Sequence, residues 1–266
     1  MNLYLTFVVN LVSGLYTSLW GAYKDSPYEG FKRHTFPRSI YFHIAIFLAL
    51  YYLPFFQNSF PFLNLIQVFF LMMGLERFLA ELYKGFFRTE DQEKYFVPSR
   101  ITFFGRHVES NLVRYLVGIV LVVAVFGLLL LDVQVRAFWV FLVVAYATGL
   151  LVSLGGAYKD APFEGFKPLK FQRSGLVLAV CSPLFYFIDH SEHPIALGLL
   201  IYMNGGLERF VVEYYKTYIQ RTMSGKFQPD LPRIQVCLDK REKFHYATLA
   251  IIAGLVVLYA YQIHTL

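Results

Sequence analysis

Long apolar stretches alternate with short polar segments along this chain. Eight stretches are long enough to cross a bilayer, which takes about 20 residues. They cover residues 3–22, 40–57, 61–82, 111–131, 136–157, 175–189, 194–214 and 244–263. The stretch 175–189 is the weakest, because it is short and contains Pro183, which tilts or breaks helices. The pattern predicts an all-α integral membrane protein with about eight transmembrane helices.

The first stretch has the length of a signal peptide but lacks two of its features. It has neither a basic leading segment nor a small-residue cleavage site, and it runs directly into a charged motif. We therefore expect it to be a transmembrane helix and not a cleaved signal peptide.

The composition agrees with a membrane protein. Of the 266 residues, 57% are apolar and 16% charged, whereas soluble domains carry about 25% charged residues. This excludes an ordinary cytosolic enzyme. The net charge of +6 does not indicate nucleic-acid binding, because the charges must first be placed relative to the bilayer. Two cysteines, Cys181 and Cys237, offer no disulfide framework and no cysteine-rich metal site.

The basic residues are distributed very unevenly. Eight crossings put both ends of the chain on one side, and 23 of the 24 Lys and Arg residues then fall on the other. They lie in or beside loops 24–39, 84–114, 159–173 and 216–243, or just before two of these loops. The positive-inside rule predicts that these loops are cytoplasmic. If some of the cations bind an anionic ligand, however, that part of the bias reflects the ligand and not the orientation.

The chain contains an internal duplication. GAYKDSPYEGFKRHTFPRS at 21–39 recurs as GAYKDAPFEGFKPLKFQRS at 156–174, with 13 of 19 positions identical, and GLERFLAELYK at 74–84 recurs as GLERFVVEYYK at 206–216, with 8 of 11 identical. Each copy holds four predicted spans, an even number, so both enter the membrane in the same sense. We expect two parallel four-helix repeats, residues 1–134 and 135–266.

The first repeated motif joins a charged segment to an Arg-Ser pair. We expect its prolines and glycines to break the helix and to form a loop that returns to the membrane. Arg-Ser at the start of the next helix offers free N–H groups, a hydroxyl and a guanidinium, which suit a phosphate. The predicted phosphate-binding residues of this motif are Arg38, Ser39, Arg173 and Ser174.

The same motif carries four carboxylates, Asp25, Glu29, Asp160 and Glu164. Three roles are open to them: holding the nearby cations, binding a divalent metal, or acting as a catalytic base. The alternative without chemistry is a salt-bridged turn that orders the membrane interface. Because both copies share the motif through duplication, its repetition does not separate these interpretations.

The second repeated motif ends the third span of each copy. On a helix Arg77, Glu81 and Lys84 form one stripe, while Glu76 points about a quarter turn away. The stripe recurs as Arg209, Glu213 and Lys216. Two interpretations are nearly balanced. The arginine and the glutamate one turn later form a structural ion pair, or they bind a lipid head group together with the Arg-Ser motif.

The remaining polar residues carry little chemistry. His190 and His193 lie beside two acidic residues, a grouping that we interpret as a polar loop tip and not as a metal site. Glycine patterns for nucleotides, catalytic-serine motifs and zinc-protease motifs are absent from the sequence. We expect no metal and no cofactor.

The second motif resembles a known family. IALGLLIYMNGGLERFVVEYYK at 195–216, followed by the apolar HYATLAIIAGLVVLYAY at 245–261, is similar to the C-terminal portion of bacterial prolipoprotein diacylglyceryl transferase. The family's arginine in this string, implicated in holding the phosphatidylglycerol head group, falls on Arg209, with Arg77 as its copy. The family's Gly-Arg-x-Gly-Asn and His-Pro-Ser/Thr-x-x-Leu-Tyr-Glu segments are absent. The family's arginine faces the periplasm, whereas the charge count places Arg209 in the cytoplasm.

Three functions follow as hypotheses. The resemblance implies a transferase of the bacterial inner membrane that acts on an anionic phospholipid, in which the arginines hold the phosphate and one of the four carboxylates is the base for a protein or lipid acceptor. The near-symmetric duplication favours a non-catalytic transporter or binder of an anionic lipid. The third hypothesis is a membrane partner subunit of a lipid-modifying complex. None of them involves nucleic acid.

Overall fold

The computed structural model describes residues 2–57, 59–89, 100–103, 106–189, 193–221 and 231–265. The protein is about 80% helical, which confirms the all-α prediction. The α-helices are α1 (Leu3–Glu29), α2 (Arg38–Tyr52), α3 (Leu65–Leu82), α4 (Asn111–Leu129), α5 (Phe138–Glu164), α6 (Pro168–Cys181), α7 (Pro183–Phe187), α8 (Leu197–Glu208) and α9 (Leu231–His264).

Short helices and strands complete the described part of the chain. The 3-10 helices are η1 (Pro54–Phe56) and η2 (Phe60–Phe62), and the π-helices are η3 (Tyr83–Phe87), η4 (Arg209–Glu213) and η5 (Tyr215–Ile219). Strands β1 (Thr102–Phe103) and β2 (Arg106–His107) pair antiparallel, as do β3 (Gln134–Val135) and β4 (Ile195–Ala196).

Each predicted apolar stretch is mostly helical. In the described residues, four segments are long and apolar enough to cross a membrane: Leu3–Pro27, Asn111–Leu129, Phe138–Tyr158 and Lys240–His264. The stretch that contains Pro183 is divided, since α6 ends at Cys181 and α7 begins at Pro183. This is the break that the proline predicted.

The helices that carry the first motif end only in part where the sequence predicted. We expected Pro27 and Pro162 together with Gly30 and Gly165 to break them, but α1 and α5 continue through both prolines. They end at Gly30 and Gly165, whose φ angles are 72° and 76°, so the glycines and not the prolines terminate the helices. Glycine adopts this left-handed region at little cost and commonly terminates helices. The Lys-Asp-x-Pro segments are therefore the last turns of helices and not loops.

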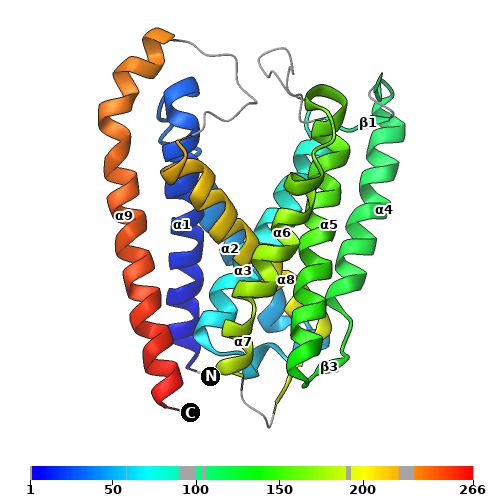
Figure 1. The fold of residues 1–266 in the computed structure, drawn as a ribbon, viewed down its shortest axis with the longest axis vertical. Coiled ribbons are helices and arrows are strands. Elements are labelled where there is room, and N and C mark those ends of the chain that lie inside the picture. Colours follow the sequence, from blue (N-terminus) through cyan, green and yellow to red (C-terminus); the bar gives the residue numbers. More distant parts are fainter. Residues whose placement is uncertain are drawn as a thin grey trace.

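The centre of the molecule is the crossing of α3 and α8, which are equivalent helices of the two copies (Figure 1). A Cβ atom on Gly74 would collide with the carbonyl oxygen of Tyr202, and one on Gly206 would collide with the carbonyl oxygen of Phe70. These two glycines are equivalent positions of the repeat. The absence of a side chain on both lets the two backbones touch.

The other helices pack around this crossing. Helix α1 packs on α2, α3 and α9, while α5 packs on α6 and α8, and α4 contacts α8 and η3. Both termini lie at the end of the molecule that also carries β3, whereas α1 and α5 finish at the opposite end, where α9 begins (Figure 1).

Candidate functional site

The crossing of α3 and α8 brings the two copies of the second motif together in an exchanged arrangement. Arg77 on α3 pairs with Glu208 on α8, and Arg209 in η4 pairs with Glu76 on α3. Arg77 also donates to the carbonyl oxygen of Gly205, at 3.2 Å. Each arginine is thus neutralised by a glutamate of the other copy.

A serine of the first motif completes each ion pair. The Ser39 hydroxyl donates to Oε1 of Glu76 at 3.1 Å, and the Ser174 hydroxyl donates to Oε1 of Glu208 at 2.6 Å. We call Ser39, Glu76 and Arg209 the first cluster. The second cluster consists of Ser174, Glu208 and Arg77. The two predicted motifs therefore meet, with each carboxylate receiving a hydroxyl and a guanidinium on different oxygens.

Both clusters are largely shielded from solvent. Glu76 is 5% exposed and Glu208 is 3% exposed, and Arg209 is also buried. A buried charge is tolerated only when it is paired and hydrogen-bonded. A guanidinium that already holds a carboxylate has the geometry to hold a phosphate, because both ligands offer paired oxygens to its planar fork.

The predicted stripe has a different role from the one expected. Glu81 pairs with Lys84 and Glu213 pairs with Lys216, both at 3.1 Å and one helical turn apart. The buried carboxylates are instead Glu76 and Glu208, which lie directly before the arginines in sequence. The arginine of each stripe reaches across the crossing, whereas its glutamate and lysine pair with each other within their own copy.

The two Arg-Ser pairs differ in their helical context. Helix α2 begins at Arg38, as predicted, and this side chain is exposed. Helix α6 begins earlier, at Pro168, because proline is favoured in the first helical turn. Arg173 and Ser174 therefore lie inside a helix, and the prediction that free N–H groups surround Ser174 is wrong. Each serine binds a glutamate directly.

The four predicted base residues lie at the ends of α1 and α5. Asp25 is part-buried and has a partner. The side chains of Glu29, Asp160 and Glu164 are outside the described residues, although the backbone at these positions is helical.

The first cluster has an aromatic wall. The guanidinium of Arg209 lies over the ring of Trp20 with 5.0 Å to the ring centroid, and the ammonium of Lys24 lies 4.7 Å from the same centroid. The indole N–H donates to Thr217 Oγ1 at 3.0 Å, which fixes the ring. In the second copy, the position of Trp20 is occupied by Gly155. This wall is therefore specific to the first cluster.

A fully buried histidine adjoins the first cluster. His43 Nδ1 lies 2.8 Å from the Ser39 carbonyl oxygen, and Nε2 lies 3.2 Å from Ser13 Oγ. His43 is not among the site residues predicted from the sequence. The replacement of this histidine by Leu178 in the second copy was the available sign that the two halves differ.

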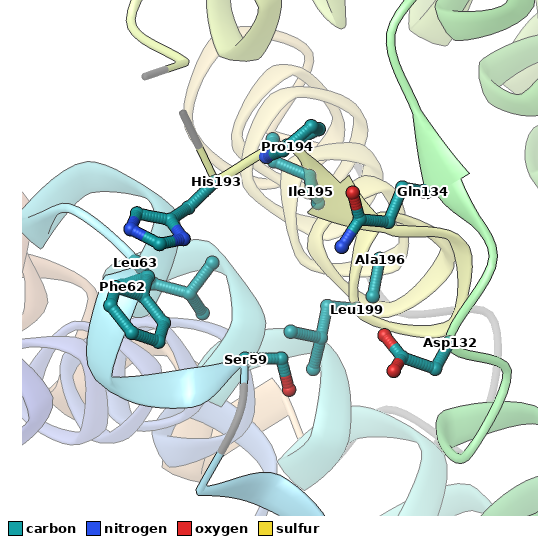
Figure 2. Close-up of a pocket in the computed structure, with 10 residues that line it drawn as sticks. All are labelled: Ser59, Phe62, Leu63, Asp132, Gln134, His193, Pro194, Ile195, Ala196 and Leu199. Carbon is teal, nitrogen blue, oxygen red and sulfur yellow. The ribbon is translucent and has the colours of Figure 1, made fainter. Parts of the chain in front are cut away.

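The described residues contain no group of three or more His, Cys, Asp or Glu side chains able to hold a metal ion. Figure 2 shows a pocket beside the β3–β4 pair, at the end that carries the termini. There the His193 ring stacks on Phe62 with 3.9 Å between ring centroids, whereas His190 lies outside the described residues. This pocket is not lined by residues of either cluster.

No protein-family model, no curated protein and no solved structure matches this chain. The resemblance to prolipoprotein diacylglyceryl transferase therefore rests only on the sequence strings quoted above.

Proposed function

We propose that the protein is an integral-membrane protein that binds an anionic phospholipid by its head group and transports it. It has eight transmembrane helices in two parallel four-helix repeats and lies in a bacterial plasma membrane with its basic loops in the cytoplasm. The observation that carries the proposal is the exchanged pairing of Arg77 with Glu208 and of Arg209 with Glu76 at the central crossing.

The exchange gives each cluster a ligand that can be replaced. A phosphate diester offers the guanidinium two free oxygens, whereas each glutamate offers it Oε2, so replacing the glutamate with the phosphate leaves the arginine with a partner. The displaced Glu76 or Glu208 keeps its serine donor. The basic side chains near Arg209, including Lys24 above Trp20, favour the approach of an anion.

The duplication favours transport over catalysis. Both ion pairs join α3 to the continuous segment formed by α8 and η4, so a movement that separates α3 from this segment weakens both together. Folds made of parallel repeats transport their substrates by rocking one half against the other. Binding of an anion in place of a glutamate supplies the differential interaction that such a movement requires.

The resemblance of 195–216 to prolipoprotein diacylglyceryl transferase favours a second candidate, a phospholipid-dependent transferase. In this candidate Arg77 and Arg209 hold the phosphate, Arg38 and Arg173 assist, and the base is one of Asp25, Glu29, Asp160 and Glu164. Most of the rate acceleration would come from electrostatic stabilisation of the departing glycerol phosphate.

Reconstitution into vesicles tests the proposal. We expect fluorescent phosphatidylglycerol, supplied in one leaflet, to reach the other faster than in protein-free vesicles, and phosphatidylcholine to move at the protein-free rate. Arg77→Lys and Arg209→Lys keep the charge but lose the planar fork, so each should slow the movement by about tenfold, the equivalent of one ion-pair hydrogen bond. Lys84→Arg is the matched control, because Lys84 pairs with Glu81 of its own copy.

The same vesicles separate the two candidates. Release of glycerol phosphate in the presence of a lipobox peptide would establish the transferase. Phosphatidylglycerol movement at the protein-free rate, with no such release, would refute both.

A further inference from the structure

We infer that the first cluster takes up a proton together with its anionic ligand, along a buried polar file on α1 that leads to His43. The identity of the ligand as a phosphate diester rests on the proposed function. The polar file consists of Thr6, Asn10, Ser13 and Thr17.

The polar file lies on one face of α1. Its spacing of four, three and four residues follows the helical repeat, and all four residues are at most 4% exposed. Neither the amide nitrogen nor the oxygen of Asn10 has a hydrogen-bond partner in the described structure, and the same holds for the Thr17 hydroxyl. Buried polar atoms without a protein partner are the positions at which proteins hold ordered water.

His43 connects this file to the first cluster. Its Nδ1 must donate to the Ser39 carbonyl oxygen at 2.8 Å, because a carbonyl only accepts. Ser13 Oγ lies 3.2 Å from Nε2 and also 2.8 Å from the carbonyl oxygen of Phe69. Ser13 has a single hydroxyl proton for these two contacts. One of them is therefore unfilled while the imidazole is neutral.

With one proton added to His43, each of these three contacts becomes a hydrogen bond with its own proton. When neutral His43 binds a proton at Nε2, the resulting imidazolium donates to Ser39 from Nδ1 and to Ser13 Oγ from Nε2. The Ser13 hydroxyl then donates to the carbonyl of Phe69. Release of the proton reverses the step and requires only a rotation of the hydroxyl. The site is consequently able to change its charge with little movement of heavy atoms.

The proton and the anion are linked through Glu76. The charged groups that act on the His43 ring are Glu76 from α3 and Arg209 from η4, while α1 and α2 present Ser13 and Ser39. Because both imidazolium N–H groups are already donated to Ser39 and Ser13, the imidazolium acts on Glu76 through its charge and so weakens the attraction between that carboxylate and Arg209. The guanidinium is then available to a phosphate diester, and the proton balances the single negative charge that enters.

The second copy lacks this arrangement. The positions equivalent to Thr6, Asn10, Ser13 and His43 hold the following residues: Phe141, Ala145, Thr148 and Leu178. Three of them are apolar and fully buried, and the Thr148 hydroxyl donates to the carbonyl of Val144 in its own helix, at 2.8 Å. Proton uptake therefore belongs to the first cluster alone.

Calorimetric titration of the full chain in nanodiscs tests the inference. Repeating the titration at pH 7.5 in buffers of different ionisation enthalpy counts the protons taken up. The probes are short-chain phosphatidylglycerol and dimethyl phosphate, a soluble diester that does not titrate near this pH. We expect wild type to take up about one proton for each ligand that occupies the first cluster, and His43→Leu and His43→Gln to take up none, with ligand still bound at the second cluster. Thr148→Ala is the matched control and should behave as wild type.

Each result has a separate meaning. Ligand binding without proton uptake by wild type, or equal uptake by wild type and His43→Gln, would overturn the inference and leave the proposed function standing. If neither short-chain phosphatidylglycerol nor dimethyl phosphate binds, the proposed function itself is overturned. Proton-linked binding of both dimethyl phosphate and the lipid would support a site that recognises the phosphate diester. Proton-linked binding of the lipid alone would support a site that also requires the acyl chains.

Discussion

At the scale of single residues, the arginines of the repeated motif are held by partners about 130 residues away in the sequence. Arg77 reaches Glu208 and Arg209 reaches Glu76. The carboxylates within their own stripes, Glu81 and Glu213, pair with lysines. A pair between two helices resists their separation, whereas a pair within one helix stabilises only that helix. The exchanged pairs therefore hold the two copies together.

A comparison of single and double substitutions measures this contribution. Glu208→Gln leaves Arg77 without its anion, and we expect a loss of about 3–5 kcal/mol in the free energy of unfolding. Arg77→Leu combined with Glu208→Leu removes both charges and should recover most of this loss. Glu81→Gln, whose pair with Lys84 is solvent-accessible, should change stability by less than about 1 kcal/mol. Denaturant unfolding in detergent, followed by tryptophan fluorescence, gives these values; equal losses for Glu208→Gln and Glu81→Gln would contradict the exchanged pairing.

At the scale of elements, glycines decide how the central helices pack. Gly74 and Gly206 remove the side chains that would hold the α3 and α8 backbones apart. The resulting approach is the reason that the side chains of Glu76 and Glu208 reach the opposite helix. Small residues serve the same purpose wherever membrane helices pack closely.

Alanine at these positions tests the packing. Gly74→Ala places a methyl group against the backbone of Tyr202, which a rotamer change does not relieve, so we expect a loss of more than about 3 kcal/mol. Gly155→Ala is the matched control, because a Cβ atom there has nothing within 4 Å. It should be neutral or stabilising by about 1 kcal/mol, owing to the helix propensity of alanine. Thermal unfolding in detergent compares the two variants, and equal melting temperatures would show that the helices do not touch at Gly74.

At the scale of the whole molecule, the charge pattern predicts an orientation in the membrane. The ends of α1 and α5 lie at the end of the molecule opposite the termini (Figure 1), and the short loops that follow these helices carry Lys32, Arg33 and Lys167. The positive-inside rule assigns this end to the cytoplasm. The resemblance to the transferase family assigns it to the periplasm.

Cysteine labelling resolves the two orientations. In a variant with Cys181 and Cys237 replaced by serine, we expect Leu169→Cys, at an exposed position at the start of α6, to resist an impermeant maleimide added to intact cells. Thr265→Cys, at the end of α9, should react under the same conditions. Both should react after permeabilisation. The reverse pattern in intact cells would place the basic loops outside and would favour the transferase.

The sequence determined the properties that depend on local pattern. Hydropathy over a window of residues located the helices, because a segment in lipid must hydrogen-bond its own backbone polar groups and present apolar side chains outward. The same local information revealed the duplication. It also showed that the basic residues lie on alternate loops. It even located the interruption at Pro183, since proline removes a backbone donor wherever it lies.

Tertiary structure decided which residues form the clusters. Helical periodicity separated Glu76 from the stripe of Arg77, but it does not specify which neighbouring helix a face meets. That depended on the close crossing of α3 and α8, which brings together residues from opposite halves of the chain. The importance of His43 likewise arises from Ser13 and Ser39 on two different helices. Local sequence fixes the face on which a side chain lies, and only the packed helices fix its partner.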